Sequence, residues 1–264
     1  MVYFLNTQIS YPCILAAFED HFSRQARQYA RYRPSYPNEL FAYLASLCAD
    51  HQLAWDCGTG SGQAALGLVD YFDSIVATDA SSEQLDHAFP HAKIEYRVEP
   101  AENVSLDASS VDLVIVAIAV HWFNFDEFYR EVRRVLKPEG ILAVWTYYLP
   151  LVEPQIDHVI QYYYSDVLAG YWPERIHYID ERYRTLPFPF EELSPPVFEM
   201  SAEWNLWQIT GFLDSWSATR NYERERGKHP LKMVWSDLID AWGSLDHTRV
   251  IRWPLHLRVG KLMQ

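Results

Sequence analysis

Apolar runs and amphipathic stretches alternate along the first 150 residues. Five apolar runs predict strands, at about 53–57, 74–79, 93–98, 111–119 and 141–146. Apolar residues at helical spacing predict helices between them, at about 61–70, 81–89 and 126–136. Gly140 is placed to end the last of these helices. The alternation predicts an α/β fold, in which helices cover both faces of a parallel sheet.

Two further helices are expected before the first strand. The first spans His21 to Tyr32 and stops at Pro34, because proline cannot continue a helix. Pro37 is suited to the first position of the second helix, whose apolar stripe continues to Cys48.

The pattern changes after Leu149. Residues 150–196 are rich in proline and aromatic residues, with one expected helix at about 154–169, which is typical of an inserted cap. The sheet pattern returns at Val197 to Trp204. Beyond it the sequence predicts helices and a closing strand interrupted by a proline, at about 206–218, 231–242 and 249–259.

Composition narrows the class of protein. Of 264 residues 49% are hydrophobic, which is enough for one large domain, or for one domain with a small cap. The net charge of −13 argues against a nucleic-acid partner, since phosphate backbones attract basic surfaces. The three cysteines are Cys13, Cys48 and Cys57, and they lack the spacing of metal ligands. They are expected to be reduced, as in a cytoplasmic protein. No apolar run reaches the roughly 18 residues of a membrane span, and no signal peptide is expected.

A glycine turn follows the first predicted strand. Gly58, Gly60 and Gly62 stand at alternate positions between that strand and a helix. Such glycines let a ligand lie on the backbone, and the helix directs its free N–H groups toward that ligand. Asp79, at the end of the second strand, is placed to hydrogen-bond a ribose diol. The pattern predicts a nucleoside-type cofactor.

The glycine turn alone fits several cofactors, among them nicotinamide dinucleotides, flavins and S-adenosylmethionine. Dinucleotide folds usually have glycine at the sixth position of G-x-G-x-x-G, and Gln63 occupies that position here. Asp56, ahead of the first glycine, can accept a hydrogen bond from turn N–H groups or from an ammonium.

The segment Asp56–Gly62 resembles motif I of class I S-adenosylmethionine-dependent methyltransferases. Later segments resemble that family's motifs in the same order, at Asp79, 100–102, 111–114 and 135–140. The resemblance covers about residues 22–150. Within the class it points to the type 11 branch, near trans-aconitate methyltransferase, through segments 29–37, 121–123 and 215–217. Glu139 departs from the pattern, which often has a second glycine there.

The resemblance implies a Rossmann-like, mostly parallel sheet of seven strands with helices on both faces and a small aromatic cap insertion. It also implies a division of the chain. Residues 1–52 would form N-terminal helices over the cofactor site, and residues 53–149 would form the cofactor-binding core. Residues 150–196 would form the cap that meets the substrate, and residues 197–264 would complete the sheet.

The resemblance implies S-adenosylmethionine as cofactor and a role for each matching residue. The turn would face the methionine and ribose, Asp79 the ribose hydroxyls, and the residues after it the adenine. The implied cofactor-binding residues are Tyr29, Arg33, Asp56, Gly58, Thr59, Gly60, Gly62, Asp79, Ala80, Ser81, Ala101, Glu102 and Ala117. Purely structural roles are the alternative, such as a helix cap for Asp79 or a surface ion pair for Arg33.

His121 follows the fourth strand, at the sheet edge where ligands bind, and is the expected catalytic base. It could instead only shape the pocket. The expected substrate pocket is aromatic, formed by Trp122, Phe123, Tyr148 and Trp216. We expect in-line methyl transfer to a small molecule, with a carboxylate or hydroxyl acceptor favoured, by a monomer or homodimer without a metal. A non-catalytic S-adenosylmethionine-binding protein and a nicotinamide-dependent oxidoreductase are the alternatives.

Overall fold

A computed structural model describes residues 34–262, which belong to one compact unit. The helix expected at His21–Tyr32, and with it Tyr29 and Arg33, lies outside the described residues. Pro37 has extended backbone angles and directly precedes the helix α2, rather than forming its first residue.

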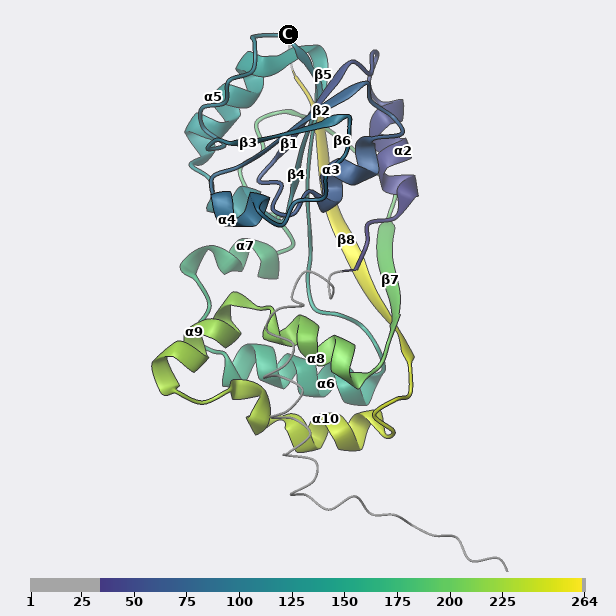
Figure 1. Cartoon of the computed structure of the whole chain (residues 1–264), viewed down its shortest axis with the longest axis vertical. Coiled ribbons are helices and arrows are strands. Elements are labelled where there is room, and N and C mark those ends of the chain that lie inside the picture. The colour runs from purple at the N-terminus through teal and green to yellow at the C-terminus, as the bar shows by residue number, and fades with distance from the viewer. Residues whose placement is uncertain (1–33, 263–264) are drawn as a thin grey trace, which may run out of the picture. The chain divides into compact units, whose positions relative to one another are not determined.

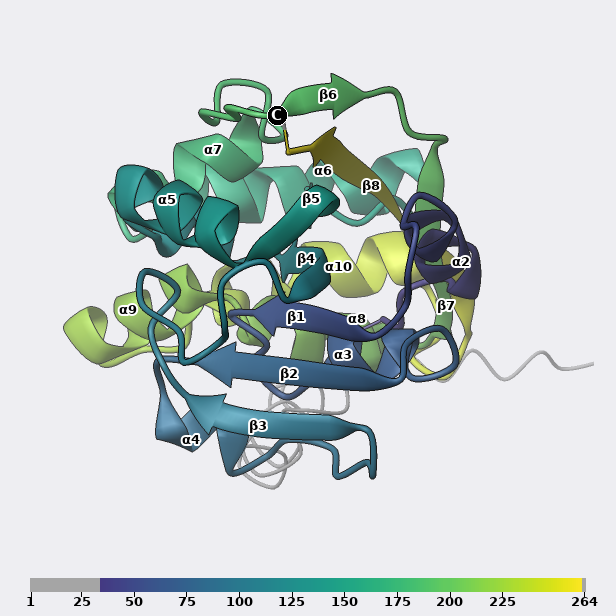
Figure 2. The ribbon, with the colours of Figure 1, turned by 90° about the horizontal axis from the view of Figure 1, so that it is seen from above.

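One mixed sheet organises the described residues (Figure 2). Its strands β1 to β5 pair in parallel, in the order β3-β2-β1-β4-β5. The long strand β8 pairs antiparallel with β5, and both β6 and β7 pair with the outer edge of β8. The strands are β1 (Leu53–Cys57), β2 (Ser74–Asp79), β3 (Ile94–Val98), β4 (Val111–Ala117), β5 (Leu136–Tyr147), β6 (Glu191–Leu193), β7 (Phe198–Trp204) and β8 (Arg249–Lys261).

This sheet confirms the predicted α/β fold. Within residues 34–262 there are eight strands rather than seven, because β6 and β7 follow one another along the same edge of β8. The closing strand tolerates Pro254, which lies opposite Glu199 of β7.

Helices cover both faces of the parallel strands (Figure 2). On one face lies α5 (Phe125–Val135), whose Phe128 and Val132 pack on Val114 in a buried cluster. On the other lie α2 (Asn38–Ser46) and α3 (Gln63–Leu68). These two helices approach closely, since a Cβ on Gly67 would lie 2.0 Å from the Phe41 ring.

The junction between α5 and β5 differs from expectation. The strand begins at Leu136, directly after the helix, and not at about 141. Gly140 therefore does not end the helix, and it is Glu139 that takes a positive φ of +63°. The sequence hides this change because the early part of β5 is polar and pairs only through Leu136, beside a register shift in β4.

A group of helices lies beyond the strand ends, where β5 leaves the sheet and β8 returns (Figure 1). The first expected helix, 154–169, is divided into an α-helix and a π-helical turn, Tyr163–Val167. Residues 206–242 hold three further helices where two were expected. The short α4 (Ser82–Leu85) lies between β2 and β3 in the chain. The other helices are α6 (Pro154–Tyr162), α7 (His177–Asp180), α8 (Leu206–Asp214), α9 (Ser217–Arg226) and α10 (Trp235–Trp242).

Candidate active site

Three glycines turn the chain from β1 toward α3. Gly58, Gly60 and Gly62 have φ angles of +71°, +56° and +81°, where L side chains are strained. A Cβ on Gly58 would lie 2.6 Å from Ala119 Cβ, and one on Gly62 would lie 2.1 Å from Tyr96 Oη. A Cβ on Gly60 would meet no described atom closer than 3.8 Å. The turn is therefore tightly packed at both ends and open at its centre.

Asp56, which precedes the turn, is fully buried. Thr59 Oγ1 donates a hydrogen bond of 2.5 Å to Asp56 Oδ2. Burial raises the pKa of the Asp56 carboxyl to about 7, although hydrogen bonding by Thr59 and by the Ala65 amide opposes that rise. The Asp56 carboxyl thus stabilises the turn through its hydrogen bond with Thr59, and it titrates near neutral pH.

Asp79 joins the glycine turn to the start of α4. Its Oδ2 accepts the Gly60 amide and its Oδ1 accepts the Ser81 amide, both at 2.9 Å. Ser81 Oγ caps α4 by accepting the Gln84 amide, and Ala80 is exposed beside it. Each carboxylate oxygen has a second lone pair, so Asp79 can still accept hydrogen bonds from a ligand that lies over the turn.

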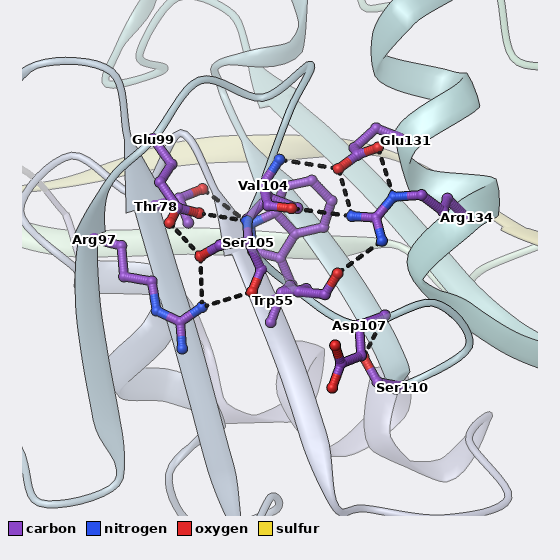
Figure 3. A network of polar contacts seen from close by, with 11 residues as sticks. Trp55, Thr78, Arg97, Glu99, Val104, Ser105, Asp107, Ser110, Glu131 and Arg134 are labelled. Atoms are coloured by element: carbon purple, nitrogen blue, oxygen red, sulfur yellow. Dashed lines mark hydrogen bonds and ion pairs between the residues drawn. The ribbon is translucent and has the colours of Figure 1, made fainter.

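The loop after β3 is held against α5 by two residues of that helix, Glu131 and Arg134, which form an ion pair with each other (Figure 3). Glu131 is buried, its Oε1 accepts the Val104 amide at 2.9 Å, and Arg134 Nη2 lies 2.6 Å from the same oxygen. Arg134 also donates to the carbonyls of Val104 and Leu106, at 3.0 and 2.7 Å. Hydrogen bonding by Arg134 lowers the pKa of the Glu131 carboxyl.

This pinned loop carries Ala101 and Glu102. Ala101 is buried, at 6% exposure. Glu102 Oε1 accepts the amide of Asn124, the residue before α5, at 2.8 Å. Glu102 therefore has a structural role, which fixes the loop after β3 to the segment after β4.

The chain turns sharply where β4 ends. Ala117 is half-buried, and Ile118 has a φ of +57°, which is rare for a β-branched residue. The Ile118 amide donates to the Trp145 carbonyl at 2.9 Å, which holds this conformation against β5. Such strain is concentrated at functional sites. The positive φ of Ile118 places the next residue, Ala119, against Gly58 of the glycine turn.

His121 follows in a short 3-10 helix and is 2% exposed. Its Nδ1 lies 2.8 Å from Tyr183 Oη, and both side chains are buried. Burial, and secondarily the charge of Arg175, lowers the pKa of His121 to about 4. His121 is therefore neutral near pH 7. When Nδ1–H donates to Tyr183, Nε2 is the nitrogen that can accept a proton.

Trp122 and Phe123 lie on different sides of this segment. The Trp122 side chain is 53% exposed, whereas the Phe123 ring packs on Phe128 at 5.0 Å and faces Gly58. Arg175 Nη1 donates to the carbonyls of His121 and Phe123, at 3.2 and 2.6 Å. Arg175 thereby joins its own segment, which lies between α6 and α7 in the chain, to the residues that follow β4.

Tyr148 and Trp216 belong to one aromatic cluster around Tyr164. Tyr148 packs edge-on against the Tyr164 ring at 5.5 Å, and Trp216 does so at 5.6 Å. Trp172 contacts both Tyr164 and Trp216. The cluster links the end of β5 to the helical group, and the structure brings these two expected pocket residues into it.

Two residues near His121 have no part in the sequence-based site, Arg175 and Tyr183. They lie 54 and 62 positions from His121 in the chain. Their segment is rich in aromatic residues and prolines, but no local spacing separates Tyr183 from its neighbours. Its positive φ of +58° is visible only in the structure.

Residues 34–262 contain no group of three or more His, Cys, Asp or Glu arranged to hold a metal ion. No helix in the same range is long and apolar enough to cross a membrane.

The comparisons identify relatives of this chain. A family model described as a methyltransferase domain matches residues 55–144. A protein of Dictyostelium discoideum, named as a methyltransferase, is 32% identical over 234 residues, which are 87% of this chain and 89% of that protein. A structure described as a type II methyltransferase from Anaeromyxobacter dehalogenans is 40% identical, with a TM-score of 0.80, and the match covers 87% of this chain and 97% of that one. Both likenesses extend beyond the region of the family model into the rest of the chain.

A shorter likeness joins the chain to a Saccharomyces cerevisiae protein that is named as an S-adenosylmethionine-dependent methyltransferase. The two are 30% identical over 135 residues. The match covers 48% of this chain and 46% of the yeast protein, so it concerns about half of each.

Proposed function

The chain belongs to the class I S-adenosylmethionine-dependent methyltransferases, in the type 11 family, and we propose that it methylates a carboxylate or hydroxyl of a small molecule. One observation supports this proposal above the others. The open glycine turn contacts Asp79 on one side and the segment that carries His121 on the other.

S-adenosylmethionine supplies a methyl group already activated by a sulfonium, so the protein has to bind, align and exclude water. The residues present fit that cofactor, because the turn is open at Gly60 and Asp79 keeps acceptor lone pairs beside it. We propose that the turn backbone binds the methionine part of the cofactor and that Asp79 accepts hydrogen bonds from the ribose hydroxyls. The further proposed contacts are Tyr29, Arg33, Asp56, Gly58, Thr59, Gly62, Ala80, Ser81, Ala101, Glu102 and Ala117.

His121 is the proposed catalytic base for a hydroxyl acceptor, through Nε2. Its pKa of about 4 makes it a weak base at neutral pH. A carboxylate acceptor is already ionised and needs no base, so the low pKa favours a carboxylate. A place near trans-aconitate methyltransferase, which remains part of the proposal, would likewise imply a small carboxylic acid as acceptor.

We propose that the helical group closes over the acceptor. The aromatic cluster of Tyr148 and Trp216, together with Trp122 and Phe123, would form the apolar wall of that pocket. Residues 150–196 would act as the cap, joined by α8 to α10, while residues 1–52 would lie over the cofactor. An enclosed site of this kind suits a compact acceptor, with the protein acting as a monomer or homodimer.

Calorimetry with S-adenosylmethionine tests cofactor binding. Asp79→Ala removes the acceptor of two backbone amides and of the proposed ribose contact. We expect affinity to fall by about 100-fold. Asp73→Ala, at an exposed acid in the loop before β2, is the matched control and should bind normally. Equal affinity in Asp79→Ala and the wild type would contradict the proposed ribose contact.

Release of S-adenosylhomocysteine from a panel of small carboxylic acids, phenols and amines tests catalysis. Turnover on acids or hydroxyl compounds supports the proposal. Cofactor binding without turnover across the panel favours the binding-only alternative. Activity confined to amines would contradict the acceptor class.

A further inference from the structure

A cavity lies at the outer edge of β8, and none of its lining residues belongs to the glycine turn. Its volume is about 510 Å³. Arg182 and Arg184, from the segment after α7, line it together with His256 and Arg258 of β8. The size is that of a small-molecule site.

The cavity exists because pairing along the edge of β8 is interrupted. The strand β6 pairs with Val259 to Lys261, and β7 pairs with Arg249 to Leu255. Within residues 34–262, residues 256–258 have no strand partner on this edge. The connection between β6 and β7 contains Pro195 and Pro196, which have no N–H to donate to the exposed carbonyls of β8.

The lining is basic although the whole chain has a net charge of −13. Its one acid, Glu192, is already engaged by Arg258 through two contacts of 2.8 Å. Within residues 34–262 the Arg182 side chain forms no hydrogen bond or ion pair, and Arg184 donates through Nε to the Glu181 carbonyl at 3.1 Å. Among the described residues, the guanidinium groups of Arg182 and Arg184 therefore have no acidic partner.

The backbone holds Arg182 in place. Arg182 and Tyr183 have consecutive positive φ angles, +56° and +58°. The Tyr183 amide donates to the Tyr178 carbonyl at 2.7 Å, which stabilises this unusual conformation. Tyr183 is fully buried against His121, while Arg182 is exposed and lines the cavity. Its charge acts on His256 across the cavity, as does that of Arg184.

We propose that this cavity binds an anionic group, a carboxylate or a phosphate, of a small molecule, with Arg182 and Arg184 as its main ligands. Guanidinium groups recognise both anions through paired N–H donors. The anion belongs either to the methyl acceptor, in which case the inference rests on the proposed function, or to a separate ligand. Arg258 links the cavity to the proposed active site, because it donates to the carbonyl of Tyr183, whose hydroxyl contacts His121.

Calorimetric titration with citrate and with inorganic phosphate, at constant ionic strength and without a methyl donor, tests the inference. We expect the wild type to bind at least one of the two, and Arg182→Ala to bind it about tenfold more weakly. Arg182→Lys, which keeps the charge, should lose less. Arg224→Ala, at an exposed arginine of α9 outside the cavity, removes the same charge and should bind like the wild type.

Two results would overturn the inference: no binding of either probe to the wild type, or the same affinity in Arg182→Ala as in Arg224→Ala. Because no methyl donor is present, neither result bears on methyl transfer itself. Once an acceptor is known, turnover in the presence of the bound probe separates the two sources. If the probe raises the KM for the acceptor and leaves kcat unchanged, the cavity is a subsite for the acceptor. If the probe changes kcat and leaves that KM unchanged, the cavity binds a separate ligand.

Discussion

Two regions at the carboxyl edge of the sheet are assembled in different ways. The glycine turn and Asp79 are 19 positions apart, and backbone amides make the hydrogen bonds that join them. His121, by contrast, depends on Tyr183 and Arg175, which come from a segment more than 50 positions away. The first region follows from local backbone requirements. The second exists only once the helical group has packed against the core.

Gly62→Ala is expected to have the largest effect on the glycine turn. The new residue would have to adopt a positive φ, and its Cβ would lie only 2.1 Å from Tyr96 Oη. The free energy of unfolding, measured by chemical denaturation, should fall by about 3 kcal/mol. Gly60→Ala, where the Cβ would meet Gln84 Oε1 at an ordinary contact distance of 3.8 Å, should cost about 1 kcal/mol because of its positive φ. Similar losses in the two variants would show that packing does not distinguish the ends of the turn from its centre.

His121→Gln should change how stability depends on pH. The folded pKa of His121, about 4, lies below its usual 6.5, so acidification protonates the unfolded chain first. Stability linked to His121 is therefore present above pH 6.5 and lost as pH falls toward 4, by roughly 3 kcal/mol at most. The variant cannot titrate there, so relative to the wild type it should become more stable as the pH falls from 6.5 to 4.

Asp56→Asn is the matched test in the local region and has the opposite sign. The folded pKa of Asp56, about 7, lies above its usual value, so stability linked to Asp56 is present at acid pH and lost as pH rises toward 7. Over pH 4 to 6.5 the two residues offset each other. Unfolding curves of the wild type should thus be flatter with pH than those of either variant. Parallel curves for all three proteins would contradict both assignments.

Glu131→Gln tests the ion pair that pins the loop after β3. Loss of the charge-assisted bonds to Arg134 should cost about 1–2 kcal/mol at pH 7. The pKa of Glu131 is lowered in the folded state, so its contribution is present above its usual pKa of 4.5, and the difference from wild type should shrink only as the pH falls below that value. Glu95→Gln removes an exposed partner of Arg97 and should leave the free energy of unfolding almost unchanged, because solvent screens that ion pair. An equal cost in both variants would deny Glu131 its special role.

Tyr183→Phe should have the smallest effect on stability, about 1 kcal/mol, since only the hydroxyl is lost. The informative readout is kinetic. A positioning role for Tyr183 predicts a lower kcat on a hydroxyl acceptor with an unchanged KM for S-adenosylmethionine. Tyr129→Phe also removes a tyrosine hydrogen bond, to the Pro187 carbonyl, but does not contact His121. If both variants lower kcat equally, the effect comes from general loosening.

Much of the core could be predicted because each element carries its own signal. The apolar run of β4 and the amphipathic stripe of α5 mark their positions, and the glycines mark the turn. The polar start of β5 could not be predicted, since it pairs with β4 only through Leu136 and no local pattern marks the positive φ of Glu139. The basic cavity was equally hidden, because Arg182 and His256 lie 74 positions apart in the sequence.

The sequence by itself determined the α/β core, the turn that suits a nucleoside-type cofactor, and the motifs by which the family is known. These features depend on backbone conformation and on periodic burial, both of which are written in neighbouring residues. Only the tertiary structure decided that His121 is buried and neutral beside Tyr183, and that arginines meet at the edge of β8. Burial and charge neighbours set these properties, and they come from segments that meet only when the chain has folded.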